Sequence, residues 1–272
     1  MKTIVPTTSH LRMLASIRDE RWAIRADSVE RFALSALEVL ERTADFSWED
    51  FYDLRQPMGI ADGVAHIQIK GALLNQTPAI YEKLGLATRY STIIQETEAA
   101  VSSGARAILY HVDSPGGTVA GVVEAGAAIQ NAGIPTAAYC HGLACSAAYW
   151  LASGAGYIMA TPSAQVGNIG AILSWADCSK FWEEMGVQFK ALVSEGADLK
   201  STFHLEPDDA QLAFLQEGIN EAGRMFREHV SAGRGNKLND EVWRAGWYSG
   251  ERAESLGLID DVASVKEALA EL

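Results

Sequence analysis

One serine, Ser146, stands where a nucleophile for acyl transfer could be activated. It lies in the stretch Cys140–Trp150, between a glycine-bearing turn and a run, Ala147–Ser153, that we predict to be helical. A residue at such a junction lies beside unpaired backbone N–H groups and the positive end of a helix dipole. Those groups stabilise the negative charge that develops on a carbonyl oxygen during attack. The position also suits a simple N-cap serine. The interpretation of Ser146 as a nucleophile therefore depends on support from other segments.

A second segment, Asp113-Ser-Pro-Gly-Gly117, is predicted to form a turn between a strand and a helix. Its glycine pair, Gly116 and Gly117, permits positive φ angles and a close approach of substrate. The N–H groups of the turn could bind an oxyanion or a phosphate. The phosphate interpretation lacks both the Gly-Lys-Ser/Thr and the GxGxxG patterns of nucleotide-binding loops.

A histidine is the first candidate for the base that Ser146 needs. His141 and Asp113 could complete a Ser-His-Asp triad. However, His141 lies at the end of a predicted strand, five residues before the serine, and its ring is poorly placed to fold back. His111 lies inside a predicted strand and is expected to be packed or half-exposed. Cys145 could itself be considered as nucleophile, but we expect it to be a core residue.

A lysine, Lys200, is the second candidate base. A lysine accepts a proton only in its neutral form, which burial away from water favours. Glu195, Asp198 and Glu206 are close in sequence and would oppose this if they were close in space. The lysine can therefore act as a base only if those carboxylates point outward while Lys200 points into the core beside Ser146.

The elements that must position these residues follow an alternating pattern from Gly63 onward. Strands separated by helices indicate an α/β architecture with mostly parallel pairing. After Pro207 the chain is predicted to be mainly helical. We predict strands at 64–70, 106–112, 135–140, 157–160, 170–175 and 259–262, and helices at 92–103, 119–131, 147–153, 208–231 and 251–258.

The N-terminal part differs in character from the rest. Asp27 to Arg42 has the apolar stripe of an amphipathic helix. We expect residues 1–60 to form a helical accessory segment, which packs on the core or acts as an assembly arm, and residues 61–272 to form the main domain.

Composition limits the classes of function. The 272 residues carry a net charge of −13, which disfavours binding to nucleic acid or to an anionic membrane. The chain has no run near the ~20 apolar residues of a membrane span and no signal-peptide pattern. The three cysteines lack zinc-ligand spacing and are expected to be reduced. We expect a cytoplasmic protein without membrane anchor, metal or other cofactor.

Taken together, these segments resemble the signal peptide peptidase family of serine proteases, which includes the head-maturation proteases of tailed bacteriophages. The resemblance runs from about Gly63 to Val262, and the interval from Ser146 to Lys200 is about what the family shows. Six segments in the family's order carry it: Asp113–Gly117, Ala144–Trp150, Ala160–Ser163, Val166–Gly170, Lys200 and Gly257–Asp260.

The resemblance implies a Ser-Lys dyad, with Ser146 as nucleophile and Lys200 as general base. One oxyanion N–H would come from the turn at Gly116 and Gly117, and a second from Ala147. The implied fold is α/β, of the Clp-protease/crotonase type built from repeated ββα units, with the N-terminal helical segment added.

The chain departs from the family at Asn168, where the family usually has a serine whose hydroxyl holds the lysine. An amide can accept a hydrogen bond from lysine, so Asn168 is expected to support the dyad. The resemblance also implies a homo-oligomeric ring in the host cytoplasm, including the interior of a procapsid. Its protein substrates would be capsid, scaffold or portal proteins.

Two alternatives from other classes stay open. A crotonase-like acyl-CoA enzyme would share the fold and the glycine-rich oxyanion turn, since a fold does not fix a function. A catalytically silent structural subunit would explain the change at Asn168 as a sign of decay.

Overall fold

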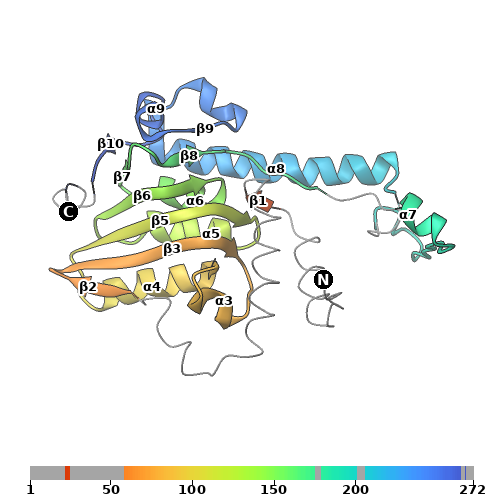
Figure 1. The fold of residues 1–272 in the computed structure, drawn as a ribbon, viewed down its shortest axis with the longest axis horizontal. Coiled ribbons are helices and arrows are strands. Elements are labelled where there is room, and N and C mark those ends of the chain that lie inside the picture. The colour runs from red at the N-terminus through yellow and green to blue at the C-terminus, as the bar shows by residue number, and fades with distance from the viewer. Residues whose placement is uncertain (1–21, 25–57, 175–178, 201–205, 265–266, 268–272) are drawn as a thin grey trace, which may run out of the picture.

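A computed structural model describes residues 22–24, 58–174, 179–200, 206–264 and 267. Its centre is a sheet with the strand order β10-β7-β6-β5-β3-β2 (Figure 1). Neighbours from β3 to β10 along this order run parallel, and β2 is antiparallel to β3. The strands are β2 (Gly59–Ala61), β3 (Val64–Leu74), β5 (Ala107–Thr118), β6 (Thr136–Cys145), β7 (Tyr157–Ala160) and β10 (Asp261–Val262).

Helices connect the successive parallel strands. They are α4 (Tyr90–Ser102), α5 (Val122–Gln130) and α6 (Ala147–Ser153), and α6 has the predicted bounds. Because side chains alternate along a strand, β3 sends Ile67 and Ile69 into the main core with these helices. It sends Val64 to a smaller cluster with Leu109 and Met159. The predicted α/β alternation is therefore confirmed.

Strand β5 is longer than the sequence pattern indicated. The segment Asp113–Gly117 is part of this strand, so the prediction of a turn there is wrong. The strand continues because Gly117 permits unusually close pairing: a Cβ on Gly117 would lie 1.7 Å from the Leu73 carbonyl oxygen. A shift of register between Val112 and Ser114 accompanies this part of the β5–β6 pairing.

The strand predicted at 170–175 is absent from the described residues 170–174, of which Ile172 alone forms an isolated bridge. Instead the chain forms β8 (Gln165–Gly167), which pairs with β6 and with β9 (Trp247–Tyr248). Ala171, Ile172 and Leu173, which follow, line a groove together with residues of helix α8.

Helix α8 (Asp209–Arg234) is the longest described helix. It begins at a capping box. The Asp208 side chain accepts from the Gln211 backbone N–H, and the Gln211 side chain accepts from the Asp208 backbone N–H. Its buried residues lie in the C-terminal half, where Phe226 stacks on Trp150 with ring centroids 4.6 Å apart. The N-terminal half runs past the end of the sheet, and α7 (Ser179–Glu184) lies near its far end (Figure 1).

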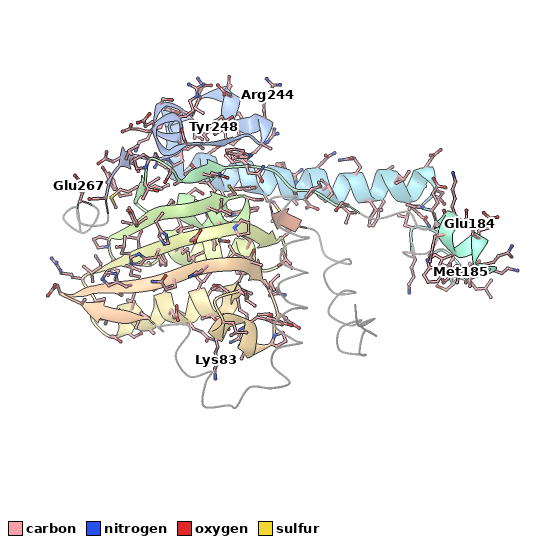
Figure 2. The ribbon with its side chains drawn as sticks, in the orientation of Figure 1. Lys83, Glu184, Met185, Arg244, Tyr248 and Glu267 are labelled. Carbon is pink, nitrogen blue, oxygen red and sulfur yellow. The ribbon has the colours of Figure 1, made fainter. Side chains whose placement is uncertain are left out.

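We call residues 179–200 and 206–221 the arm. Figure 2 shows Glu184 and Met185 at its outer end. The arm exposes large apolar side chains, namely Phe181, Met185, Val187, Leu192, Val193, Leu199, Leu212 and Phe214. The described residues therefore leave this hydrophobic surface uncovered.

Shorter elements complete the described structure: β1 (Trp22–Ile24), α3 (Ala79–Lys83), β4 (Ala87–Arg89), η2 (Gly235–Lys237), η3 (Asp240–Arg244) and α9 (Gly250–Ser255). The helix expected at Asp27–Arg42 lies outside the described residues, as does most of the expected accessory segment 1–60. Of that segment, β1 and the start of β2 are described as strands. Among the helices described, none combines the length and apolarity needed to cross a membrane.

Candidate active site

Ser146 lies at a sharp turn between β6 and α6. Its backbone angles are φ 58° and ψ −123°, a combination that is costly for any residue with a side chain. Two hydrogen bonds hold the turn: the Ser146 N–H donates to the Gly167 carbonyl at 2.8 Å, and the Ser146 carbonyl accepts from the Trp150 N–H at 2.9 Å. A strained strand–turn–helix connection of this kind presents the nucleophile in α/β-hydrolases.

The Ser146 hydroxyl has no role as a helix cap. Within the described part of the chain, it makes no hydrogen bond to the first turn of α6, which an N-cap serine would make. Its Oγ lies 3.5 Å from the Gly170 carbonyl oxygen, at the limit of a hydrogen bond. The side chain is buried, with 1% exposure of the residue. A strained, sequestered hydroxyl without a capping role favours the nucleophile over the structural interpretation.

The glycine pair lies alongside Ser146. Ser114 of β5 pairs with Ala144 of β6, and two further residues along each strand lead to Gly116 and to Ser146. The Gly116 N–H donates to the Ser114 Oγ at 3.1 Å and is therefore engaged within the strand. This contact of Ser114 was not predicted from the sequence, although the position of Ser114 within Asp113-Ser-Pro-Gly-Gly117 could have indicated it.

Backbone N–H groups of α6 also lie beside the serine. Ala147 is the first residue of this helix and is fully buried. The first N–H groups of a helix have no partner within the helix. Together with Gly117, Ala147 is the remaining predicted source of oxyanion donors.

Asp113 has a structural task. Its Oδ1 accepts the Leu143 N–H at 3.0 Å and joins β5 to β6. A Cβ on Gly142 would lie 2.2 Å from the same oxygen, so the glycine makes room for the carboxylate. Among the described residues, no hydrogen bond joins Asp113 to His141, so the Ser-His-Asp arrangement is not found.

His141 lies with other histidines on neighbouring strands. Its ring is 6.4 Å from that of His111 and 6.0 Å from that of Tyr139. His66 Nδ1 and His111 Nε2 are 2.9 Å apart. Burial, then the neighbouring His66 and His141, lower the pKa of His111 to about 4. Among the described residues, no cluster of His, Cys, Asp and Glu is arranged to hold a metal ion.

The cysteine beside Ser146 is a core residue, as predicted. Cys145 is fully buried and its Sγ donates to the Gln165 carbonyl at 3.3 Å. Burial, then Cys145, raise the pKa of the Cys140 thiol to about 12, so Cys140 stays a thiol. Cys178 lies outside the described residues.

Asn168 follows Gly167 with a left-handed backbone, φ 57°. Its Nδ2 donates to the Ala245 carbonyl at 2.9 Å, and its N–H donates to the Gly246 carbonyl at 2.7 Å. An asparagine tolerates this backbone better than most residues. In the described chain its amide group thus ties the end of β8 to the segment before β9.

Lys200 is exposed in the described chain, in the arm. The neighbouring Asp198 carbonyl accepts from Gln211 Nε2 at 2.9 Å, which fixes this segment to the start of α8. From Gln211 to Phe226 the helix spans roughly 22 Å at about 1.5 Å per residue. Phe226, further along this helix, packs on Trp150 of α6. The expected burial of Lys200 in its own core is not found, and within the described residues Lys200 makes no hydrogen bond to Ser146.

Comparison with known proteins identifies the family. The model of peptidase family S49 matches residues 128–272, which is more than half of the chain and includes Ser146 and Lys200. The chain therefore belongs to peptidase family S49, and the expected relationship to signal peptide peptidases and phage head proteases is confirmed, together with the α/β fold of the Clp-protease type.

Two curated relatives illustrate its range. Capsid assembly protease C of Escherichia phage lambda is 29% identical over 89% of this chain and 56% of its own length. Protease 4 of Salmonella typhi is 28% identical over 92% of this chain and 42% of its own length. The chain thus spans about half the length of these relatives. A solved structure of the 1510-N membrane-bound stomatin-specific protease is 18% identical, with a TM-score of 0.47 over 76% of this chain and 83% of the other.

Proposed function

We propose that this chain is a serine endopeptidase in which Ser146 is the nucleophile and Lys200 the general base. The neutral amine of Lys200 takes the hydroxyl proton as Oγ bonds to the substrate carbonyl carbon. The resulting oxyanion is stabilised by the N–H groups of Gly117 and Ala147. The ammonium then protonates the leaving amine as the peptide bond breaks. Water hydrolyses the acyl-enzyme and restores Ser146.

The observation that carries this proposal is the backbone of Ser146. Strain of this kind costs on the order of 1–3 kcal/mol and persists where function requires it. An acyl-CoA enzyme of the same fold would give the strained serine no role.

The position of Lys200 leads us to propose that a second copy of the chain supplies the base. The arm carries both Lys200 and a set of exposed apolar side chains, among them Phe181 and Leu192. Exposed apolar surface of this extent marks a contact with another molecule. A groove of about 570 Å³ between Ile172 and Leu215 adds to this surface. Packing of arms in a homo-oligomer would bury them and bring one copy's Lys200 towards another copy's Ser146.

The substrate class follows from the relatives. The lambda relative is named a capsid assembly protease. We propose that the substrates are capsid, scaffold or portal proteins of a phage head. The strongly acidic composition, with a net charge of −13, fits protein rather than nucleic-acid substrates.

Complementation between two inactive variants tests the dyad and its origin. Ser146→Ala and Lys200→Ala are purified separately, and cleavage of an unfolded protein such as casein is followed for each and for their mixture after exchange of subunits. Each variant alone should be inactive. In a random mixture about one quarter of the sites combine an intact serine with an intact lysine from a neighbour. Lys190→Ala, an exposed lysine on the same arm, is the matched control and should keep full activity.

Each outcome is decisive. Recovery of activity supports a base from a second copy. Two inactive variants whose exchanged mixture stays inactive would assign the dyad to one chain and refute the shared site. Full activity of either single variant would refute the dyad. Mapping of new N-termini after co-expression with capsid proteins, with Ser146→Ala as control, then tests the substrate class.

A further inference from the structure

Strand β1 occupies an edge of β5 next to Ser146. It pairs antiparallel with β5 in the register Trp22–Thr118, Ala23–Gly117 and Ile24–Gly116. A strand has two edges, and β3 takes one of them here, through Ala72 opposite Gly116 and Leu73 opposite Gly117. β1 must therefore lie on the other edge, which is the edge that β6 takes earlier along β5.

β6 leaves this edge free because it ends at the nucleophile. Its last pair with β5 is Ala144–Ser114, and the chain then turns away at Ser146 into α6. Two residues beyond that pair, Gly116 faces Ile24 instead. β1 thus continues the line of β6, directly beyond the turn that holds Ser146. Figure 1 shows β1 at the carboxyl end of β5.

The same edge is the place where an extended peptide would pass the nucleophile. A peptide that adds a strand to a sheet edge gains main-chain hydrogen bonds. On this edge such a peptide would lie along Gly116–Thr118, beside the hydroxyl of Ser146 and the start of α6. One strand position cannot hold two strands at once.

We propose that residues 22–24 occupy the substrate-strand position of the active site and act as a built-in competitor. This inference rests on the proposed function, because it takes Ser146 as the nucleophile. A peptide substrate binds only when β1 has left the edge. The contact is three residues long, so it opens readily, and the tethered strand raises the apparent Michaelis constant without changing the maximal rate.

Proline at position 23 tests the inference in the full chain. Ala23→Pro removes a backbone N–H and disfavours the strand. Ala61→Pro in β2, another three-residue antiparallel strand, is the matched control. Ala23→Pro should lower KM for a peptide substrate by about fivefold or more with kcat unchanged. Ala61→Pro should leave KM as in the unmodified chain.

A binding experiment separates this inference from the proposed function. The probe is a fluorescent peptide with the sequence of residues 18–28, and the protein carries Ser146→Ala. The double variant Ser146→Ala/Ala23→Pro should bind the peptide about fivefold or more tightly than Ser146→Ala alone, because β1 no longer occupies the edge of β5. Equal affinities, or no binding to either protein, would overturn the inference.

A peptide with proline in place of Ala23 is the control ligand and should bind more weakly than the native sequence. This comparison needs no change in β1 of the protein, so it decides the matter even if Ala23→Pro does not fold. Equal binding of the two peptides would refute a strand site. If peptide binding follows the expected pattern while Ser146→Ala retains proteolysis, the strand site stands and the serine mechanism fails.

Discussion

The C-terminal end of α8 is anchored by a buried ion pair whose loss should be costly. Arg234, the last residue of α8, is 3% exposed. Its guanidinium donates to both carboxylate oxygens of Asp260, at 2.7 and 3.0 Å, and to the Gly257 carbonyl at 3.0 Å. Lys237 Nζ and the Ile158 N–H also donate to this carboxylate. The pair therefore joins the helix that continues into the arm to the sheet at β7.

The pKa of the Asp260 carboxylate gives the size of the expected loss of folding free energy. Burial raises the pKa of Asp260, but the bonds from Arg234, Lys237 and Ile158 outweigh this and lower it from 3.8 to about 2. At 1.36 kcal/mol per pKa unit, the ionised form contributes about 2 kcal/mol to folding. Because the folded pKa is depressed, this contribution is present above pH 3.8 and is lost as the pH falls towards 2. Asp260→Asn also leaves a buried guanidinium without its counter-charge, so we expect a loss of about 3–5 kcal/mol at pH 7.

Urea unfolding at pH 7 measures this loss. Lys237→Ala is the matched control, since Lys237 contacts the same carboxylate but its side chain is 61% exposed. An exposed partner contributes about 1 kcal/mol or less. A double replacement of Arg234 and Asp260 by Met and Leu should cost less than Asp260→Asn alone, because it leaves no unpaired charge. A loss below about 1 kcal/mol for Asp260→Asn, or one equal to that of Lys237→Ala, would refute the reasoning.

Two further predictions concern the sheet. The folded chain excludes a proton from His111, whose pKa falls from 6.5 to about 4, so the free energy of unfolding should decline as pH falls between these values. His111→Gln should reduce that slope in urea titrations; an unchanged slope would contradict it. Gly117→Ala should abolish cleavage and cost several kcal/mol, since its Cβ would meet the Leu73 carbonyl. Gly223→Ala, in open space on α8, should be neutral or stabilising by up to about 1 kcal/mol, and thermal denaturation of both distinguishes the cases.

Local patterns predicted much of the core. The alternation of apolar residues gave β3, α4, α5, α6 and β7, because burial of one face imposes a period of 2 on strands and 3.6 on helices. The junction at Ser146 was also predictable, since a strand, a small residue and a helix follow one another in the sequence. The turn predicted at Asp113–Gly117 was wrong, because the glycines there permit close strand pairing rather than a turn.

Contacts over long distances in sequence were not predictable in this way. The pairing of β1 with Gly116–Thr118 joins residues almost a hundred positions apart in the sequence. In addition, a strand of three residues is too short for its hydrophobic periodicity to predict it. The position of Lys200 was missed for a similar reason. Sequence spacing does not show that α8 extends beyond the core, and the exposed apolar residues of the arm look the same in sequence as buried ones.

The backbone angles of Ser146 lower the stability of the fold at the same position that provides the reactive hydroxyl. A glycine there would adopt the same angles at little steric cost, and the chain would fold more tightly while losing its hydroxyl. Serine at this position therefore makes the fold less stable than glycine would, and it provides an alcohol held at the head of a helix.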